Sequence, residues 1–266
     1  MNGTYSLQSF FKVLDDFAPI TLSKKMIDLG EYDNSGILVK THDYVSKALF
    51  ALDLSEETLK KAKRLGADTV VTHHPAIYTP IKTLDEESTL SGAVTKAVKM
   101  GLNVISMHLN LDVAEGGIDA SLAEGLGATE FKILSYVTEK NGYGRFFKID
   151  KQPLSTFVRN VKNNFSTNKV IYYGSKTRVI ENVASFCGGG ASHAVDALEN
   201  GLDADVIVTS DVAHHHIKAV LDKGVALVVL PHHVSEEYGF KKYFEKIKNV
   251  VKSDVEVAYF DDRRFR

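Results

Sequence analysis

Short apolar strands and amphipathic helices alternate along much of this chain, and this alternation restricts the possible folds more than any other feature. Residues 47–54 are an expected strand, residues 56–66 an expected helix, and residues 68–72 a second strand that ends at His73. A chain that repeats strand, helix and strand in this order builds a largely parallel sheet covered by helices. The sequence therefore predicts an α/β fold.

The ends of the expected helices carry recognisable signals. Ser55 is a candidate N-cap of the helix over 56–66, and Gly66 is suited to stop it in a left-handed conformation. A helix over 91–101 and a strand over 103–107 continue the alternation, and apolar residues at helical spacing predict a first helix over 8–17.

The same alternation returns towards the other end of the chain. The segments GADTVVTHH and DADVIVTSD look like one element used twice, each followed by a helix, a glycine and another buried strand. A helix with Phe240, Phe244 and Ile247 on one face and a last strand over 254–260 complete this part.

The alternation predicts two similar α/β halves with mostly parallel sheets, joined by a short α/β insert. The expected ranges are 1–128 for the N-terminal half, 129–179 for the connecting insert and 180–266 for the C-terminal half. The insert has a strand, helix and strand pattern and contains no histidine.

The composition narrows the class of partner and of site. A net charge of −2 gives no electrostatic reason for nucleic acid or a membrane to be the main partner. The first residues lack the pattern of a signal peptide, and no apolar run reaches the length of a membrane span. With Cys187 as its single cysteine, the chain is expected in the cytoplasm, and any metal site must use histidines and carboxylates.

Histidines are concentrated at expected strand ends. Eight of the ten lie in four short segments, three of which directly follow an expected buried strand. Since the carboxyl ends of parallel strands meet at one edge of a sheet, these side chains can converge. Asp112 follows His108 by four residues, and Glu236 follows His232 by four. The eight histidines are His73, His74, His108, His214, His215, His216, His232 and His233.

Imidazoles and carboxylates without thiolates are the ligand mixture that suits Zn, Fe, Mn, Co or Ni. More than four candidate ligands predict two divalent metal ions per chain. The competing interpretation is structural, because a single histidine at a strand end is more often a core or capping residue. On a helix, His214–His216 would fan over different faces, so that at most one or two could face a site.

Five segments in this chain resemble the NIF3 family, also known as GTP cyclohydrolase 1 type 2 homologues. They occur in the order of the family and extend from residue 31 to residue 239. They are EYDNSGILV (31–39), GADTVVTHHPAIY (66–78), HLNLD (108–112), TSDVAHHH (209–216) and PHHVSEEYG (231–239). Two positions depart from the family, which usually has glycine where this chain has Ser210 and Pro231.

The resemblance implies a dinuclear metal site with His108 close by, and a ring-like homohexamer. The implied ligands are His73, His74, Asp112, His232 and Glu236. The pair His233 and Glu237 has the same spacing and is the alternative to His232 and Glu236. Helical periodicity favours Glu236, since it lies four residues before Phe240 on the inward face, whereas Glu237 is expected to face solvent. Pro75 is expected to hold a turn that directs one imidazole of the pair at 73 and 74 to each ion.

Two ions that share a site most often catalyse hydrolysis. The sequence therefore predicts a metal-dependent hydrolase, with His108 as proton shuttle if it is not a ligand. The resemblance implies that its substrate is a nucleotide or a related small molecule. The family label implies opening of the guanine ring of GTP, although the chain has no P-loop, and CGGGASH (187–193) could equally be a phosphate cradle or a packing turn. The alternatives are a non-enzymatic metal scaffold or metal chaperone, and a dinuclear phosphoesterase. The latter usually has an aspartate before the histidine pair, where this chain has Thr72.

Overall fold

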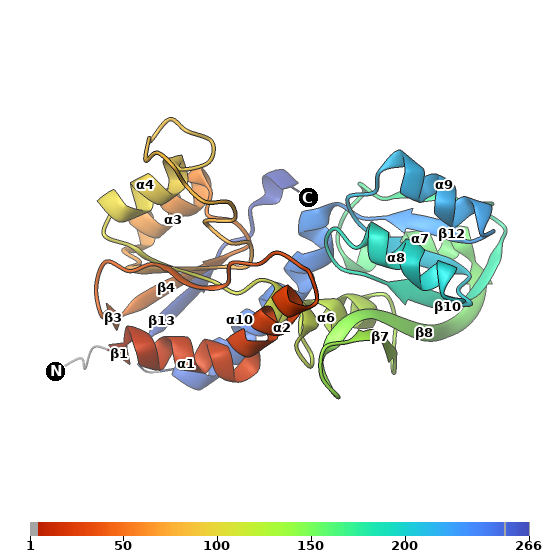
Figure 1. Cartoon of the computed structure of the whole chain (residues 1–266), viewed down its shortest axis with the longest axis horizontal. Coiled ribbons are helices and arrows are strands. Elements are labelled where there is room, and N and C mark those ends of the chain that lie inside the picture. The colour runs from red at the N-terminus through yellow and green to blue at the C-terminus, as the bar shows by residue number, and fades with distance from the viewer. Residues whose placement is uncertain (1–4, 253, 266) are drawn as a thin grey trace. The chain divides into compact units, whose positions relative to one another are not determined.

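The computed structural model describes residues 5–252 and 254–265, which divide into two compact units. Unit 1 extends to Ala114 and resumes from Phe240 to Arg263, and unit 2 comprises Glu115–Gly239 together with the chain after Arg263. Each unit has its own sheet with helices packed on its faces (Figure 1). The α/β class predicted from the alternation of strands and helices is confirmed.

Unit 1 is built on a five-stranded sheet in the order β13-β4-β5-β6-β2. Strands β13, β4, β5 and β6 run parallel, and β2 pairs antiparallel with β6. A separate antiparallel pair is formed by β1 (Tyr5–Ser6) and β3 (Tyr44–Val45). The strands of the main sheet are β2 (Gly36–Val39), β4 (Lys47–Ala51), β5 (Thr69–Thr72), β6 (Asn103–Ser106) and β13 (Glu256–Tyr259).

Helices cover both faces of the unit 1 sheet. On one face, α3 and α4 pack against Leu49, Val70 and Val104 (Figure 1). Because successive strand residues point to opposite faces, Phe50 faces the other way and contacts the rings of Phe240 and Phe244 on α10. The helices are α1 (Leu7–Phe17), α2 (Ile20–Asp28), α3 (Glu56–Leu65), α4 (Gly92–Lys99), α5 (Leu109–Val113) and the later turns of α10 (His232–Val251). The 3-10 turn η1 (Arg263–Phe265) begins at the last residue of unit 1.

The helix signals read from the sequence are confirmed at α3 and α10. The Ser55 hydroxyl accepts a hydrogen bond from the Thr58 amide, and Gly66 ends α3 in the left-handed conformation at φ 66°. Phe240, Phe244 and Ile247 are buried, as their spacing on α10 predicts.

Unit 2 has a six-stranded mixed sheet in the order β7-β8-β10-β11-β12-β9. Its centre is parallel, from β10 through β11 to β12, whereas β7, β8 and β9 pair antiparallel at the sides. The second sheet is therefore less uniformly parallel than the sequence predicts. The strands are β7 (Lys132–Tyr136), β8 (Gly142–Pro153), β9 (Ile171–Tyr173), β10 (Val179–Ser185), β11 (Val206–Thr209) and β12 (Ala226–Val229).

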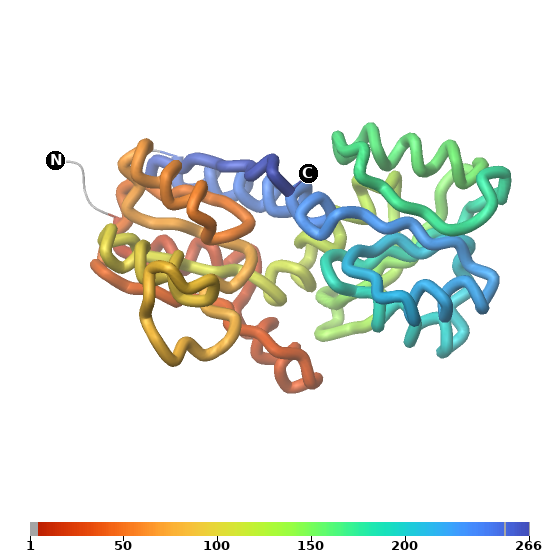
Figure 2. The backbone as a smooth tube through the Cα atoms, turned by 90° about the horizontal axis from the view of Figure 1, so that it is seen from above, coloured from red at the N-terminus to blue at the C-terminus, as the bar shows by residue number. Residues whose placement is uncertain are grey.

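The helices of unit 2 also lie on both sides of their sheet. Helices α8 and α9 pack through Ala194, Leu198 and Val220 against one face, and Figure 2 shows α7 on the opposite side of the sheet. The helices are α6 (Ile118–Gly125), α7 (Leu154–Asn164), α8 (Ala191–Glu199), α9 (His214–Asp222) and the first turns of α10.

The observed units differ in their boundaries from the ranges 1–128, 129–179 and 180–266. Residues 240–263 belong to unit 1 because β13 pairs in parallel with β4. The insert over 129–179 contributes β7, β8 and β9 to the second sheet. Strand pairing between segments far apart in the chain sets these boundaries, and local hydrophobic patterns do not reveal it.

Helix α10, with 20 residues, has the length that a bilayer span would need, but charged residues recur along it. Glu236, Glu237, Lys241 and Lys242 fall within two successive turns. Among the residues that the structure describes, no helix is both long and apolar enough to cross a membrane.

Candidate metal centre

Four polar side chains of unit 1 follow three neighbouring parallel strands. Asp53 comes shortly after β4, His73 and His74 directly follow β5, and His108 comes two residues after β6. The carboxyl ends of these strands share one edge of the sheet, which is where ligands bind in α/β folds. The convergence that the sequence predicts for His73, His74 and His108 therefore occurs within this unit.

The chain leaves the sheet at the adjacent pair of histidines. The backbone amides of His73 and His74 both donate to the Leu52 carbonyl, at 3.2 and 3.0 Å. The Thr72 hydroxyl donates to the His74 carbonyl at 2.8 Å, which closes the bend. Both rings thus lie on the same side of the strand end, with their centroids 5.0 Å apart. The sequence assigns this turn to Pro75, whereas the hydrogen bonds that hold it are made to Leu52 and by Thr72.

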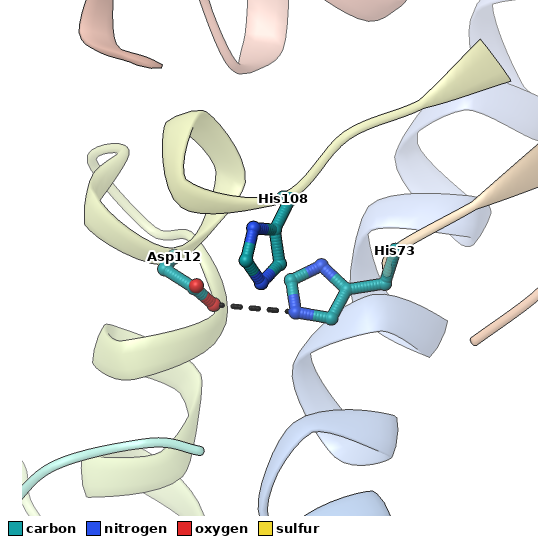
Figure 3. A group of neighbouring side chains, drawn as sticks. All are labelled: His73, His108 and Asp112. Atoms are coloured by element: carbon teal, nitrogen blue, oxygen red, sulfur yellow. Dashed lines mark ion pairs between the residues drawn. The ribbon is translucent and has the colours of Figure 1, made fainter. Parts of the chain in front are cut away.

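His73, His108 and Asp112 form a compact group of possible ligands (Figure 3). His73 is fully buried and Asp112 is 5% exposed, and one donor atom from each of the three residues lies within 4.8 Å of the others. Asp112 joins the group because the short helix α5 turns it back towards His108. The His73 Nε2 lies 3.4 Å from the Asp112 Oδ1. This is about the separation of two ligands that each lie ~2.0–2.1 Å from one tetrahedral ion.

In each of the three histidines at this edge of the sheet, the Nδ1 atom has a hydrogen-bond partner of its own. Such partners are typical of metal-binding histidines, because they fix the ring orientation and the tautomer and make the Nε2 atom the ligand. The pairs are His73 Nδ1 with the Met107 carbonyl at 2.8 Å, His74 Nδ1 with the Asp53 carboxylate at 2.7 Å, and His108 Nδ1 with the Asp33 carboxylate at 2.8 Å. The residues present therefore fit a divalent metal ion.

Asp33 is kept ionised for its role beside His108. Burial would raise the pKa of the Asp33 carboxyl, but hydrogen bonds from His108, Ser23 and Ser35 outweigh burial and hold this pKa below its usual value. An ionised Asp33 accepts the His108 Nδ1–H. The sequence analysis quoted Asp33 only as part of a motif and did not identify it as a site residue.

Unit 2 has a second group with the same design. Gly188, Asp211 and His232 follow the neighbouring parallel strands β10, β11 and β12. The His232 Nδ1 is hydrogen bonded to the Asp211 carboxylate, and its Nε2 lies 2.9 Å from the Glu236 Oε1. Glu236 is 2% exposed and lies in the first turns of α10. The pairing of His232 with Glu236, favoured from their spacing, is thus a contact in this unit.

The other late histidines and acids lie in different surroundings. Glu237 is only 8% exposed and His233 only 7%, so the prediction that Glu237 faces solvent is wrong. Helical periodicity places Glu237 about 100° from Glu236 around the helix axis, but it cannot show whether other parts of the protein bury both side chains. The His233 ring lies against Phe265, with centroids 5.6 Å apart. Among the described residues, His214–His216 at the start of α9 belong to no candidate metal group.

Gly188 lies directly behind the pair of His232 and Glu236. A Cβ atom at this position would lie 2.5 Å from the Glu236 Oε1 and 3.4 Å from the His232 Nε2. The backbone of Gly188 is also left-handed, at φ 55°, and its amide donates to the Ser235 hydroxyl at 3.2 Å. The glycine run after β10 therefore packs against His232 and Glu236, which favours the packing interpretation of CGGGASH over a phosphate cradle.

Replacing Gly188 with alanine is expected to leave the protein folded but to lower its metal content. The new methyl group would displace the end of the flexible Glu236 side chain, and the left-handed backbone would add about 1–2 kcal/mol of strain. Gly189→Ala is the matched control, since its Cβ would meet no atom within 4 Å. Elemental analysis of both variants tests this, and equal metal content in the two would contradict it.

Comparison with known proteins identifies the family. The model of the Duf34/NIF3 (NGG1p interacting factor 3) family matches residues 5–264. The chain belongs to the Duf34/NIF3 family. A family relative from Clostridium perfringens, named GTP cyclohydrolase 1 type 2 homolog, is 30% identical over 254 residues, which is 94% of each chain. NIF3-like protein 1 of Drosophila melanogaster is 24% identical and covers 90% of this chain and 80% of its own.

Solved structures share the fold over nearly the whole chain. The Staphylococcus aureus hypothetical protein SA1388 superposes with a TM-score of 0.84 at 22% identity, covering 97% of this chain and 96% of its own. Reduced HcgD from Methanocaldococcus jannaschii superposes with a TM-score of 0.77 at 24% identity, covering 98% and 100%. At these identities the similarity establishes the NIF3 fold and carries no information on activity.

Proposed function

We propose that this protein binds two divalent metal ions per chain and is a metal-dependent hydrolase of a nucleotide or a related small molecule. The observation that carries the proposal is the repeated anchoring of imidazoles: His73, His74, His108 and His232 each have Nδ1 bonded to a carbonyl or carboxylate oxygen. A histidine that is merely packed in a core does not need such a partner on the same nitrogen each time.

The proposed ligands come from both groups. They are His73, His74 and Asp112 in unit 1, and His232 and Glu236 in unit 2. Five proposed ligands are more than one tetrahedral ion takes, which supports two ions per chain. The donor set lacks thiolates, which suits Zn, Fe, Mn, Co or Ni.

Divalent ions in such a site supply Lewis acidity and a water that is activated near neutral pH. The remaining steps fall to the chain itself. His108 is the proposed proton shuttle. Its Nδ1–H is held by the ionised Asp33, and its side chain is 15% exposed, so that it can exchange protons with solvent. If His108 is instead a third ligand beside His73 and Asp112, His108→Ala lowers metal content as well as turnover. A shuttle alone would leave metal content unchanged.

The substrate class is proposed from the names of relatives. Several relatives carry the name GTP cyclohydrolase 1 type 2 homolog, which points towards nucleotide chemistry. Protein purified without a metal-affinity tag should contain metal by elemental analysis. After loading with each candidate metal, it should turn over at least one member of a panel of nucleotides and phosphoesters. Bound metal without any turnover would favour a metal scaffold or chaperone, and cleavage of phosphoesters alone would favour a phosphoesterase.

Glu236→Gln is expected to abolish or weaken the binding of one metal ion and to abolish hydrolysis. Glu237→Gln should retain the metal content and the activity of the wild type. The reason is that the Glu236 carboxylate lies against the His232 Nε2, and an amide is a much weaker ligand than a carboxylate. Elemental analysis and turnover are measured on both variants. The two side chains are similarly buried, so a general loss of stability would affect both alike. The reverse pattern would transfer the ligand role to His233 and Glu237.

We also propose a homohexamer in the cytoplasm. Exposed apolar side chains on the side strands of the unit 2 sheet support an assembly, since Tyr136 on β7 is 60% exposed and Ile171 on β9 is 58% exposed. The lone, buried Cys187 suits a reducing compartment. Light scattering at micromolar concentration should give six times the mass of one chain, and a monomer would contradict the assembly.

A further inference from the structure

Two exposed tyrosines lie beside the histidine group of unit 1. Tyr32 is 51% exposed and Tyr78 is 48% exposed, and their ring centroids are 4.9 Å apart at an interplanar angle of 79°. The Tyr78 ring is in turn 6.3 Å from the His108 ring. An edge-to-face pair of this kind leaves an aromatic corner open to solvent next to the proposed metal ligands.

The tyrosines are fixed relative to the ligands by hydrogen bonds. The Asn34 side-chain amide donates to the Ile77 carbonyl at 2.6 Å, which ties the segment of Tyr32 to the segment of Tyr78. Asp33, adjacent to Tyr32, holds the His108 ring. The segment that carries Tyr78 also carries His74, four residues earlier. The aromatic corner is therefore built from the same two loops that orient the histidines.

Both positions expose large aromatic rings where a polar residue would serve solubility equally well. Tyrosine offers a broad, rigid contact surface at low cost in conformational entropy, and this makes it a frequent residue for binding ligands. A planar ring can stack on one tyrosine while its edge meets the other. The phenol hydroxyls add hydrogen-bonding groups at the rim of the corner.

We propose that Tyr32 and Tyr78 form a stacking site for a planar nitrogen heteroaromatic ring of the nucleobase type. The site would hold the ring of the substrate while the adjoining polar part reaches the histidine group. This inference rests on the proposed metal centre for its place in catalysis, but ring binding itself can be measured without turnover.

The test is calorimetric titration of metal-loaded protein with the four common ribonucleoside 5′-monophosphates, and with ribose 5-phosphate as a matched probe that lacks the ring. At least one nucleotide should bind more tightly than ribose 5-phosphate. Tyr32→Ala and Tyr78→Ala should each lower the affinity for that nucleotide by about tenfold or more and leave the affinity for ribose 5-phosphate unchanged. Tyr32→Phe and Tyr78→Phe should retain most of the affinity, because they keep the stacking face. Tyr44→Ala is the control for loss of an exposed tyrosine elsewhere, since Tyr44 is 42% exposed.

The outcomes separate this inference from the proposed function. The inference is overturned if no nucleotide binds better than ribose 5-phosphate, or if both alanine variants bind the nucleotide like the wild type. Metal content is measured on the same samples, so that a chain without metal that still binds the ring through the tyrosines refutes the metal centre alone. If the alanine variants instead lower the mass in light scattering, the tyrosines form a contact between copies of the chain, and the stacking site is wrong.

Discussion

Metal content is expected to fall to near zero when His73 and His74 are both replaced by alanine. The His73 Nε2 lies 3.4 Å from Asp112 at a fully buried position, and the His74 ring is held by Asp53 beside it. The double variant removes two proposed ligands at once. Loss of a partner that only orients a ligand weakens metal binding about 10- to 100-fold, so loss of two ligands should weaken it by more than ~100-fold. Elemental analysis after dialysis measures the change.

The control for this experiment is a variant with the same residue change outside the site. His214→Ala with His215→Ala removes two exposed histidines at the start of α9. It should retain the metal content of the wild type. Circular dichroism and thermal melting in the presence of a chelator show whether the site variant is folded. Full metal stoichiometry in a folded variant lacking His73 and His74 would refute the proposed site.

Arg145→Met is expected to lower the free energy of unfolding by about 3–5 kcal/mol. Arg145 is 1% exposed, and its Nη1 lies 2.9 Å from the carboxylate of Asp119, which is fully buried. The same Nη1 also donates to the carbonyls of Gly142 and Gly144 at 2.9 and 3.1 Å. Methionine fills much of the same space but leaves the charge of Asp119 buried. Urea unfolding measures the effect, with Arg159→Met on the exposed side of α7 as the control expected within about 0.5 kcal/mol of the wild type.

The loss of unfolding free energy that Arg145→Met causes should become smaller as the pH falls. Burial raises the pKa of the Asp119 carboxyl, and the Arg145 guanidinium and the Cys187 amide offset only part of this effect. Without Arg145 the pKa rises further. An acid whose pKa is higher in the folded than in the unfolded chain is destabilising at a pH above both values. This destabilisation declines as the pH falls below the folded-state pKa and disappears below the unfolded-state pKa. Urea unfolding at neutral and mildly acidic pH tests the sign, and a deficit that grows on acidification would contradict it.

Sequence patterns identify the histidines of the candidate site better than they identify the acids that hydrogen bond to those histidines. His73 and His108 could be selected because they follow apolar strands, and parallel strands end at a common edge. Asp33, Asp53 and Asp211 could not be selected in this way, because isolated acids are common in loops. Their roles depend on which strands are neighbours, and the order β4-β5-β6 is decided by long-range pairing. Helical period gave the inward side of α10 correctly, but it could not show that Glu237 is buried as well.

The position of β13 beside β4 makes the order of synthesis matter for folding. All the strands of unit 2 lie between residues 115 and 239, so they have all been made once residue 239 has been added. The sheet of unit 1 is complete only after residues 256–259 have been synthesised, because β13 pairs with β4, which is among the first strands to be made. Until then one side of β4 has open backbone groups, and Phe50 lacks the α10 rings that cover it. On the ribosome, the later half of the molecule can therefore complete its sheet before the earlier half, and the nascent first sheet is the part most in need of protection from aggregation.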